Sequence, residues 1–213
     1  METKHLKIVF IIDESGSMQG SNSDVIGGFN SFIERQKTEN TGKITVSLYK
    51  FNNLVTRVIS NKPAAKVRNL TNEDYTPSGF TALYDAIGQA IHETDKQLSA
   101  QPEKERPDKV MVVIITDGEE NASKEFSATA IKSSISTHEE LLHWSFIFLS
   151  SGLDNFQDAE AMGIKYRANA PAWKLKKNID HVAESSIMYC MSPERDEKDI
   201  IENLVSDLNN EEN

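Results

Sequence analysis

Residues 8–17 read Ile-Val-Phe-Ile-Ile-Asp-Glu-Ser-Gly-Ser. The five apolar residues at 8–12 are typical of a central strand that is buried on both faces of a sheet. Asp13 ends this run, and Ser15 and Ser17 follow it at alternate positions. An extended loop can direct such alternate side chains at one point. The stretch therefore predicts a buried strand whose carboxyl end presents one carboxylate and two hydroxyls.

A second stretch also consists of an apolar run that ends at an aspartate. Residues 110–115 form the most apolar run of the chain, and Thr116-Asp117-Gly118 ends it. In open α/β sheets, ligands bind where the chain leaves the carboxyl ends of the strands. We therefore expect Asp117 to lie near Asp13, at one edge of a shared sheet.

Outward from these two strands, helical and strand spacings alternate along the chain. Apolar residues at helical spacing predict helices over residues 25–33, 83–91, 127–142, 154–162 and 172–188. Further strands are predicted over residues 44–49, 144–149 and 164–166, and Asn52-Asn53 predicts a hairpin that continues through Val55 and Val58. The predicted fold class is α/β: a doubly wound, Rossmann-like, mostly parallel six-stranded sheet with one antiparallel edge strand and helices on both faces.

The last part of the chain differs in composition from the rest. Residues 1–191 are predicted to form one domain, and residues 192–213 an acidic C-terminal tail or helix with eight acids against two bases. An apolar stripe at helical spacing runs through this tail: Ile200, Ile201, Leu204, Val205 and Leu208. The stripe either packs on its own domain, which we favour, or docks on another protein.

Composition narrows the classes of partner and compartment. The formal net charge of −10 disfavours binding to nucleic acid, because phosphates would be repelled. The basic cluster of Lys174, Lys176 and Lys177 is small, and we interpret it as a solvated helix face. The apolar runs are too short to span a membrane, and the first of them is too short for a signal peptide. With Cys190 as the single cysteine, we expect a cytoplasmic protein with no membrane partner.

The polar residues at the two strand ends have the chemistry of a cation site. Ser78-Gly79-Phe80-Thr81 supplies a further hydroxyl just before the helix predicted at residues 83–91. Carboxylates and hydroxyls are hard oxygen ligands, which suit Mg²⁺, Mn²⁺ or Ca²⁺ and suit zinc poorly. Taken alone, Thr81 is more typical of a helix N-cap and Asp117-Gly118 of a turn. The metal hypothesis rests on their joint occurrence.

Three segments together resemble a known family. Asp13-Glu14-Ser15-Gly16-Ser17-Met18, Gly79-Phe80-Thr81-Ala82-Leu83-Tyr84-Asp85-Ala86 and Ile115-Thr116-Asp117-Gly118-Glu119-Glu120 are similar to a von Willebrand factor A domain with an intact metal ion-dependent adhesion site. The resemblance covers about residues 6–190. It is strongest to the stand-alone intracellular members of bacteria and their phages.

The resemblance implies a set of metal ligands and a function. Ser15, Ser17 and Thr81 would contact Mg²⁺ (or Mn²⁺ or Ca²⁺) directly, while Asp13 and Asp117 would act through water and hydrogen bonds. Neutral hydroxyls leave the cation electrophilic, so that an Asp or Glu of a protein partner would complete its shell. The positive end of the helix after Thr81 would favour this carboxylate. The implied role is that of an adaptor or scaffold, with partners such as an AAA+ ATPase or another component of a stress or defence system.

Two other functions stay open at this point. A metal-dependent phosphatase or hydrolase of the haloacid type would carry a second acid where this chain has Ser15. A P-loop would need a lysine after Gly16, and this chain has none there. A dinucleotide-binding fold would need the motif Gly-x-Gly-x-x-Gly, but Gly27-Gly28 lie inside a predicted helix. We therefore do not expect an enzyme. The other alternative is a purely structural metal with binding through the C-terminal tail.

Overall fold

A six-stranded sheet forms the centre of the molecule. The computed structural model describes residues 4–39, 42–150 and 156–210. The strands lie in the order β3-β2-β1-β4-β5-β6, with the bounds β1 (His5–Asp13), β2 (Lys43–Phe51), β3 (Val55–Pro63), β4 (Lys109–Thr116), β5 (Trp144–Ser150) and β6 (Tyr166–Asn169). Each pairing is parallel except that of β2 with β3, which the Asn52-Asn53 hairpin joins. The fold is the doubly wound α/β sheet with an antiparallel edge strand that the sequence predicts.

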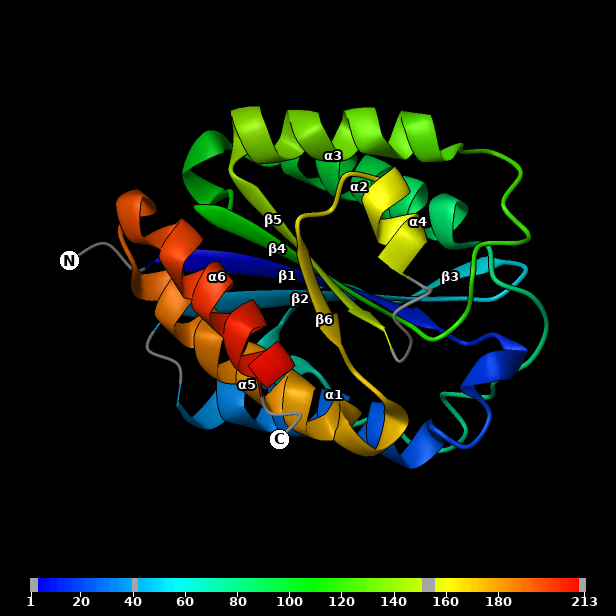
Figure 1. Cartoon of the computed structure of the whole chain (residues 1–213). Coiled ribbons are helices and arrows are strands. Elements are labelled where there is room, and N and C mark those ends of the chain that lie inside the picture. The colour runs from blue at the N-terminus through cyan, green and yellow to red at the C-terminus, as the bar shows by residue number, and fades with distance from the viewer. Residues whose placement is uncertain (1–3, 40–41, 151–155, 211–213) are drawn as a thin grey trace.

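Helices cover both faces of this sheet, as Figure 1 shows. One face carries α1 (Asn22–Thr38), α5 (Ala172–Met191) and α6 (Glu194–Asn210), and the other carries α2 (Leu83–Ser99), α3 (Ala128–Leu142) and α4 (Phe156–Ala161). The part of the chain that the structure describes also contains three short 3-10 helices: η1 (Gly16–Met18), η2 (Ala64–Lys66) and η3 (Glu103–Glu105). Within the described residues, no helix is long and apolar enough to cross a membrane.

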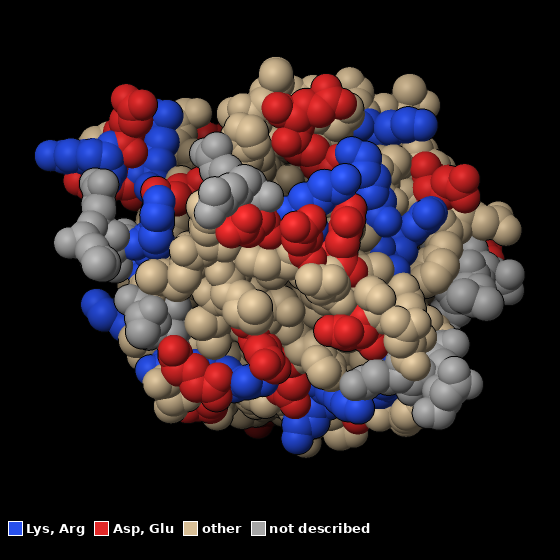
Figure 2. All heavy atoms as spheres, turned by 60° about the vertical axis from the view of Figure 1, so that its left-hand side comes forward, with Lys and Arg blue, Asp and Glu red and all other residues tan. Residues whose placement is uncertain are grey.

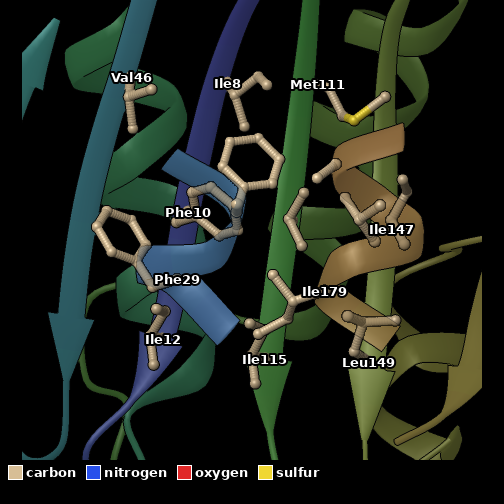
Figure 3. Close-up of a cluster of buried hydrophobic side chains, with 14 of the residues drawn as sticks. Ile8, Phe10, Ile12, Phe29, Val46, Met111, Ile115, Ile147, Leu149 and Ile179 are labelled. Atoms are coloured by element: carbon tan, nitrogen blue, oxygen red, sulfur yellow. The ribbon is translucent and has the colours of Figure 1, made fainter. Parts of the chain in front are cut away.

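Strand β1 is central because both of its faces are buried. Ile8, Phe10 and Ile12 enter the hydrophobic core under α1 and α5, whereas Val9 and Ile11 enter the core under α2 and α3. Figure 3 shows the first of these cores, with Phe10 lying against Phe29 of α1 at a ring-centroid distance of 5.4 Å. This packing fixes the position of Asp13 at the end of the strand.

Two predicted elements differ from the observed ones. The edge strand expected at residues 164–166 is β6 at Tyr166–Asn169, because pairing with the end of β5, from Ile147↔Tyr166 to Ser150↔Asn169, sets its position. Its mostly polar sequence carries little strand signal of its own. The short helix expected at 154–162 is observed as α4 from Phe156, and residues 154 and 155 lie outside the described residues.

The acidic C-terminal segment forms α6 and packs on its own domain. Ile201, Leu204 and Leu208 of its apolar stripe are buried in the core shared with α1 and α5. Two buried lysines bind it at either end: Lys109 Nζ lies 3.0 Å from Glu197 Oε1, and Lys174 Nζ donates to the Leu208 carbonyl at 2.8 Å. Lys174 is therefore not part of a solvated face, and this interpretation was wrong for that residue.

The surface around this end of the molecule carries both signs of charge. Figure 2 shows the left-hand side of Figure 1 turned forward, and there Lys and Arg side chains are interspersed with Asp and Glu side chains. The charge balance of the face is thus mixed, although the whole chain has a net charge of −10.

Candidate functional site

The loop after β1 turns back on the carboxylate that ends the strand. Asp13 is fully buried, and its Oδ1 accepts a hydrogen bond of 2.7 Å from the Ser15 amide. This contact curls the chain into η1, so that the hydroxyls of Ser15 and Ser17 lie 2.9 Å apart. One turn of chain thus presents a carboxylate and two hydroxyls side by side.

Strand β4 brings a second carboxylate to the same place. It pairs directly with β1, with Ile12 opposite Ile115, so that the two strands end together at the right-hand side of Figure 1. Thr116 Oγ1 donates to Asp13 Oδ2 at 2.6 Å. Asp117 follows; it accepts a hydrogen bond from the Ser17 side chain, and its charge acts on Asp13.

Thr81 comes from a third segment, just before α2. Its amide donates to Asn121 Oδ1 at 2.9 Å, and its carbonyl accepts from the amides of Asn121 and Ala122. Thr81 is not the N-cap of α2, because that position belongs to Ala82. Its backbone groups are thus held by the loop after β4, and its buried hydroxyl is left for the site.

The space beside Gly118 shows that these segments converge. A Cβ atom built on Gly118 would lie 2.8 Å from Thr81 Oγ1, 3.0 Å from Ser17 Oγ and 3.4 Å from Asp13 Oδ2. Two oxygens from β1 and the loop after it, and one from the segment before α2, therefore lie around one small space beside the loop after β4. Their chemistry fits Mg²⁺, Mn²⁺ or Ca²⁺. Within the described residues, no group of three or more His, Cys, Asp or Glu side chains could hold a metal, so a cation here depends on the hydroxyls.

Burial disfavours the charged forms of the two aspartates of the site. It raises the pKa of Asp13 to about 6, against the lowering effect of hydrogen bonds from Thr116 and Ser15, and the charge of Asp117 adds to the rise. Burial also raises the pKa of Asp117, against a hydrogen bond from Ser17. A cation between these groups would favour their charged forms. The raised pKa values of Asp13 and Asp117 and the oxygen ligands thus both fit a cation at this position.

The segment before α2 supports the site in a way that the sequence does not reveal. The phenol of Tyr75 is buried and donates to the Asp13 carbonyl at 2.6 Å. Glu14 Oε1 accepts from the Thr76 amide at 2.6 Å and from Lys50 Nζ at 2.7 Å. These contacts fix the backbone of Asp13 and the direction of the Glu14 side chain. Glu14 thus stabilises the loop after β1.

The β2–β3 hairpin holds the segment that carries Thr81. Asn53 Oδ1 accepts from the Phe80 amide at 2.9 Å, and the Ala82 amide donates to the Asn52 carbonyl at 2.9 Å. Gly79, directly before Phe80, has a φ of +80°, and a Cβ atom there would clash with Asn53 Oδ1. Its carbonyl accepts from the Gly16 amide at 3.0 Å. Glycine at position 79 thus lets the hairpin, the Thr81 segment and the η1 loop meet.

The N-terminus of α2 is occupied by the chain itself. The amide of Tyr84 donates to Glu120 Oε2 at 3.0 Å, and that of Asp85 donates to Ser123 Oγ at 3.1 Å. Asp158 of α4 then accepts from the Glu120 amide and from the Tyr84 hydroxyl. The expectation that this helix end would favour an incoming carboxylate needs correction, because Glu120 already takes that role.

All five predicted site residues therefore lie in one region at the carboxyl edge of the sheet: Asp13 ends β1, and the other four lie in the loops that follow. The oxygens of Asp13, Ser15, Ser17 and Thr81 are placed by the distances above, and Asp117 by its hydrogen bond to Ser17. Their role as metal ligands stays a prediction. The sequence reasoning missed a group of supporting residues: Tyr75, Thr116, Glu120, Asn121, Asn53 and Glu14 with Lys50.

Comparison with known proteins gives a family and a set of similar folds. The model of the von Willebrand factor type A domain matches residues 7–138. No curated protein sequence matches the chain. A structure of proximal thread matrix protein 1 from the mussel byssus with a zinc-occupied MIDAS motif is 18% identical, with a TM-score of 0.60 over 87% of this chain and 46% of that one. The chain thus spans less than half the length of this mussel protein.

Two microbial structures are similar as well. Manganese-loaded TRAP protein of Plasmodium vivax is 15% identical, with a TM-score of 0.54 over 83% of this chain and 74% of that one. The vWF domain of the type V pili tip protein Mfa5 of Porphyromonas gingivalis is 10% identical, with a TM-score of 0.62 over 91% of this chain and 98% of that one. At these identities the likeness concerns the fold.

Proposed function

Because the chain belongs to the von Willebrand factor type A domain family, we propose that it binds a protein partner through one divalent metal ion. Asp13, Ser15, Ser17, Thr81 and Asp117 would hold this ion. The observation that carries the proposal is the small space beside Gly118, which oxygens of Thr81, Ser17 and Asp13 surround within 3.4 Å. The mussel and Plasmodium structures with zinc and manganese support a divalent metal.

Three of these residues would contact the metal ion directly, and the two aspartates would act on it through hydrogen bonds. The hydroxyls of Ser15, Ser17 and Thr81 are uncharged ligands, and the two aspartates act through hydrogen bonds such as that of Ser17 with Asp117. Magnesium is the ion that we propose for the cell, because all the donors are hard oxygens. When bound, the ion supplies a Lewis-acidic position that a carboxylate of a partner's Asp or Glu can fill.

A binding role fits the site better than a catalytic one. The position two residues after Asp13 holds Ser15, where a haloacid-type hydrolase has its second acid, and Gly27-Gly28 lie inside α1. The tail alternative is disfavoured, since Ile201 and Leu208 of the α6 stripe are buried in the chain's own core. We propose an adaptor or scaffold that works in the cytoplasm, and an AAA+ ATPase or a stress or defence component as the class of partner.

Two measurements test this function. Calorimetry with Mg²⁺ and with Mn²⁺ should show one site in the wild type and none in Asp13→Ala or Thr81→Ala. Glu73→Ala and Thr56→Ala are matched controls, since both side chains are exposed, and they should bind metal like the wild type. A pull-down from native lysate should then recover a partner with Mg²⁺ and lose it with chelator. Metal binding that survives in both site variants would refute the assignment.

A further inference from the structure

Two large apolar side chains are exposed on the segment that carries Thr81 and on the hairpin that holds this segment. Phe80 directly precedes Thr81 and is 63% exposed, and Leu54 follows the hairpin turn at Asn52-Asn53 and is 75% exposed. Single exposed apolar residues are ordinary on protein surfaces, whereas apolar residues that are exposed together among polar ones form contact surfaces. We call Phe80 and Leu54 the apolar rim.

The backbone holds both members of the apolar rim in place. The Phe80 amide donates to Asn53 Oδ1 at 2.9 Å, and the Leu54 amide donates to Asn52 Oδ1 at 3.1 Å. The Leu54 carbonyl in turn accepts from the Asn52 amide at 3.1 Å. The main chain of both residues is thus held by neighbouring asparagines of one hairpin turn. A surface that is ordered before binding loses less entropy when a partner docks.

The same contacts tie the apolar rim to the metal site. The Ala82 amide donates to the Asn52 carbonyl, so that Thr81 lies on a segment anchored to the hairpin on both sides. Gly79 connects this segment to Gly16 in the η1 loop. Phe80 is therefore exposed on the segment that presents Thr81 to the site, one residue before it.

The charge around the site narrows the class of segment further. Glu119 is exposed two residues after Asp117, and the chain has a net charge of −10. A run of acids in the partner would be repelled by these charges. A single acid next to an apolar side chain would place its carboxylate at the metal and lose apolar area from water at the rim.

We infer that the apolar rim of Phe80 and Leu54 selects a partner segment in which one Asp or Glu stands beside a large apolar residue. This inference rests on the proposed metal-dependent function and names the class of ligand for the same site. Phe80 and Leu54 act in it as residues that determine specificity, and they take no part in holding the metal.

Synthetic peptides with a central Glu test this directly. The first peptide flanks Glu with glycines, the second places Phe before or after Glu, and the third keeps Phe but replaces Glu with Gln. Each is titrated into Mg²⁺-loaded protein labelled with ¹⁵N, and the dissociation constant is taken from the amide shifts. Phe80→Ser and Leu54→Ser are the test variants. Leu141→Ser is the matched control, because Leu141 is 70% exposed on α3.

The inference predicts that Phe beside Glu tightens binding to the wild type roughly tenfold over the glycine-flanked peptide, which equals about 1.4 kcal/mol. Phe80→Ser should lose this gain in affinity, and Leu54→Ser should show a smaller gain. Leu141→Ser should keep the gain in full. Mn²⁺ affinity without peptide should be equal in all of them. The Gln peptide should not bind.

Two results would overturn the inference, and they differ in what else they refute. Equal binding of the glycine-flanked and Phe-containing peptides, or a gain that survives in both rim variants, refutes the apolar rim and leaves the metal function standing. No binding of any Glu peptide to metal-loaded protein refutes the rim together with the proposed function.

Discussion

Thr116 at the end of β4 donates its hydroxyl to Asp13 at the end of β1, with 2.6 Å between Thr116 Oγ1 and Asp13 Oδ2. The second oxygen of the same carboxylate accepts the Ser15 amide. Asp13 is therefore fixed from the neighbouring strand and from its own loop, and it cannot turn away from the site without losing both contacts. This rigidity is what a site preorganised for a cation needs.

Gly118→Ala should strongly weaken metal binding with the fold intact. The added Cβ would lie 2.8 Å from Thr81 Oγ1 and 3.0 Å from Ser17 Oγ, inside the space proposed for the cation. We expect Mn²⁺ affinity to fall at least tenfold in calorimetry, with circular dichroism like that of the wild type. Gly27→Ala is the control, since a Cβ there meets nothing closer than 3.8 Å. Unchanged Mn²⁺ affinity in Gly118→Ala would place the metal elsewhere.

Tyr75→Phe should weaken metal binding through its contact with the main chain of Asp13. The variant keeps the buried ring but removes the 2.6 Å hydrogen bond to the Asp13 carbonyl. We expect the free energy of unfolding to fall by about 1 kcal/mol, and Mn²⁺ affinity to fall several-fold because Asp13 is held less firmly. Urea unfolding and calorimetry measure the two effects. Tyr166→Phe serves as the control, and equal metal affinity in both variants would remove Tyr75 from the support of the site.

Much of this arrangement could be predicted from the sequence, and the reason is local. The apolar runs before Asp13 and Asp117 define buried strands, and the alternation of Asp13, Ser15 and Ser17 is visible within five positions. Thr81 was visible as a hydroxyl just before the predicted helix at residues 83–91, and the family resemblance joined it to the other two segments. By contrast, Tyr75 reaches Asp13 across 62 positions of the chain, and Asn121 reaches Thr81 across 40. No spacing rule connects such residues, so only the folded structure reveals their contacts.

The missed details have the same origin. Strand β6 is placed by its pairing with β5 rather than by its own polar sequence. Lys174 looked like a solvated basic residue, but α6 covers it and its ammonium binds the Leu208 carbonyl. Whether residue 191 is a true domain boundary stays a prediction, since α6 shares the core of the preceding residues.

Acid should destabilise the protein partly through His5. Burial, with help from the charge of Lys43, lowers the pKa of His5 to about 4, so the unfolded chain binds more protons than the folded one between about pH 6.5 and pH 4. Stability is therefore lost as the pH falls through this window. The wild type should lose more unfolding free energy than His5→Gln between pH 7 and pH 4.

This comparison isolates His5 from an opposing effect. The raised pKa of Asp13 means that acid favours the folded state through that group, but the effect is common to the wild type and to His5→Gln. The difference between their urea unfolding curves at each pH reports His5 alone. Parallel loss of stability in the two proteins would show that His5 keeps its ordinary pKa in the fold.

Lys109→Met should release α6 without affecting the metal site. Lys109 Nζ binds the Tyr189 carbonyl at 2.6 Å and the Ser192 carbonyl at 2.7 Å, and it pairs with Glu197. Its removal leaves a largely buried carboxylate unpaired, which costs about 3 kcal/mol. Hydrogen exchange should accelerate in α6, while Mn²⁺ affinity stays unchanged. Lys198→Met removes a lysine whose side chain is 73% exposed, and it should alter neither property.

The most direct test of the account is a measurement of carboxylate contact with the metal. Mn²⁺-loaded protein is saturated with the Phe-Glu peptide carrying ¹³C in its side-chain carboxyl, and electron-nuclear double resonance records the coupling between Mn²⁺ and ¹³C. The account predicts a coupling typical of a directly bound carboxylate, which disappears with unlabelled peptide and in Asp13→Ala. Bound Mn²⁺ and bound peptide without any ¹³C coupling would contradict the claim that a partner's carboxylate completes the metal site.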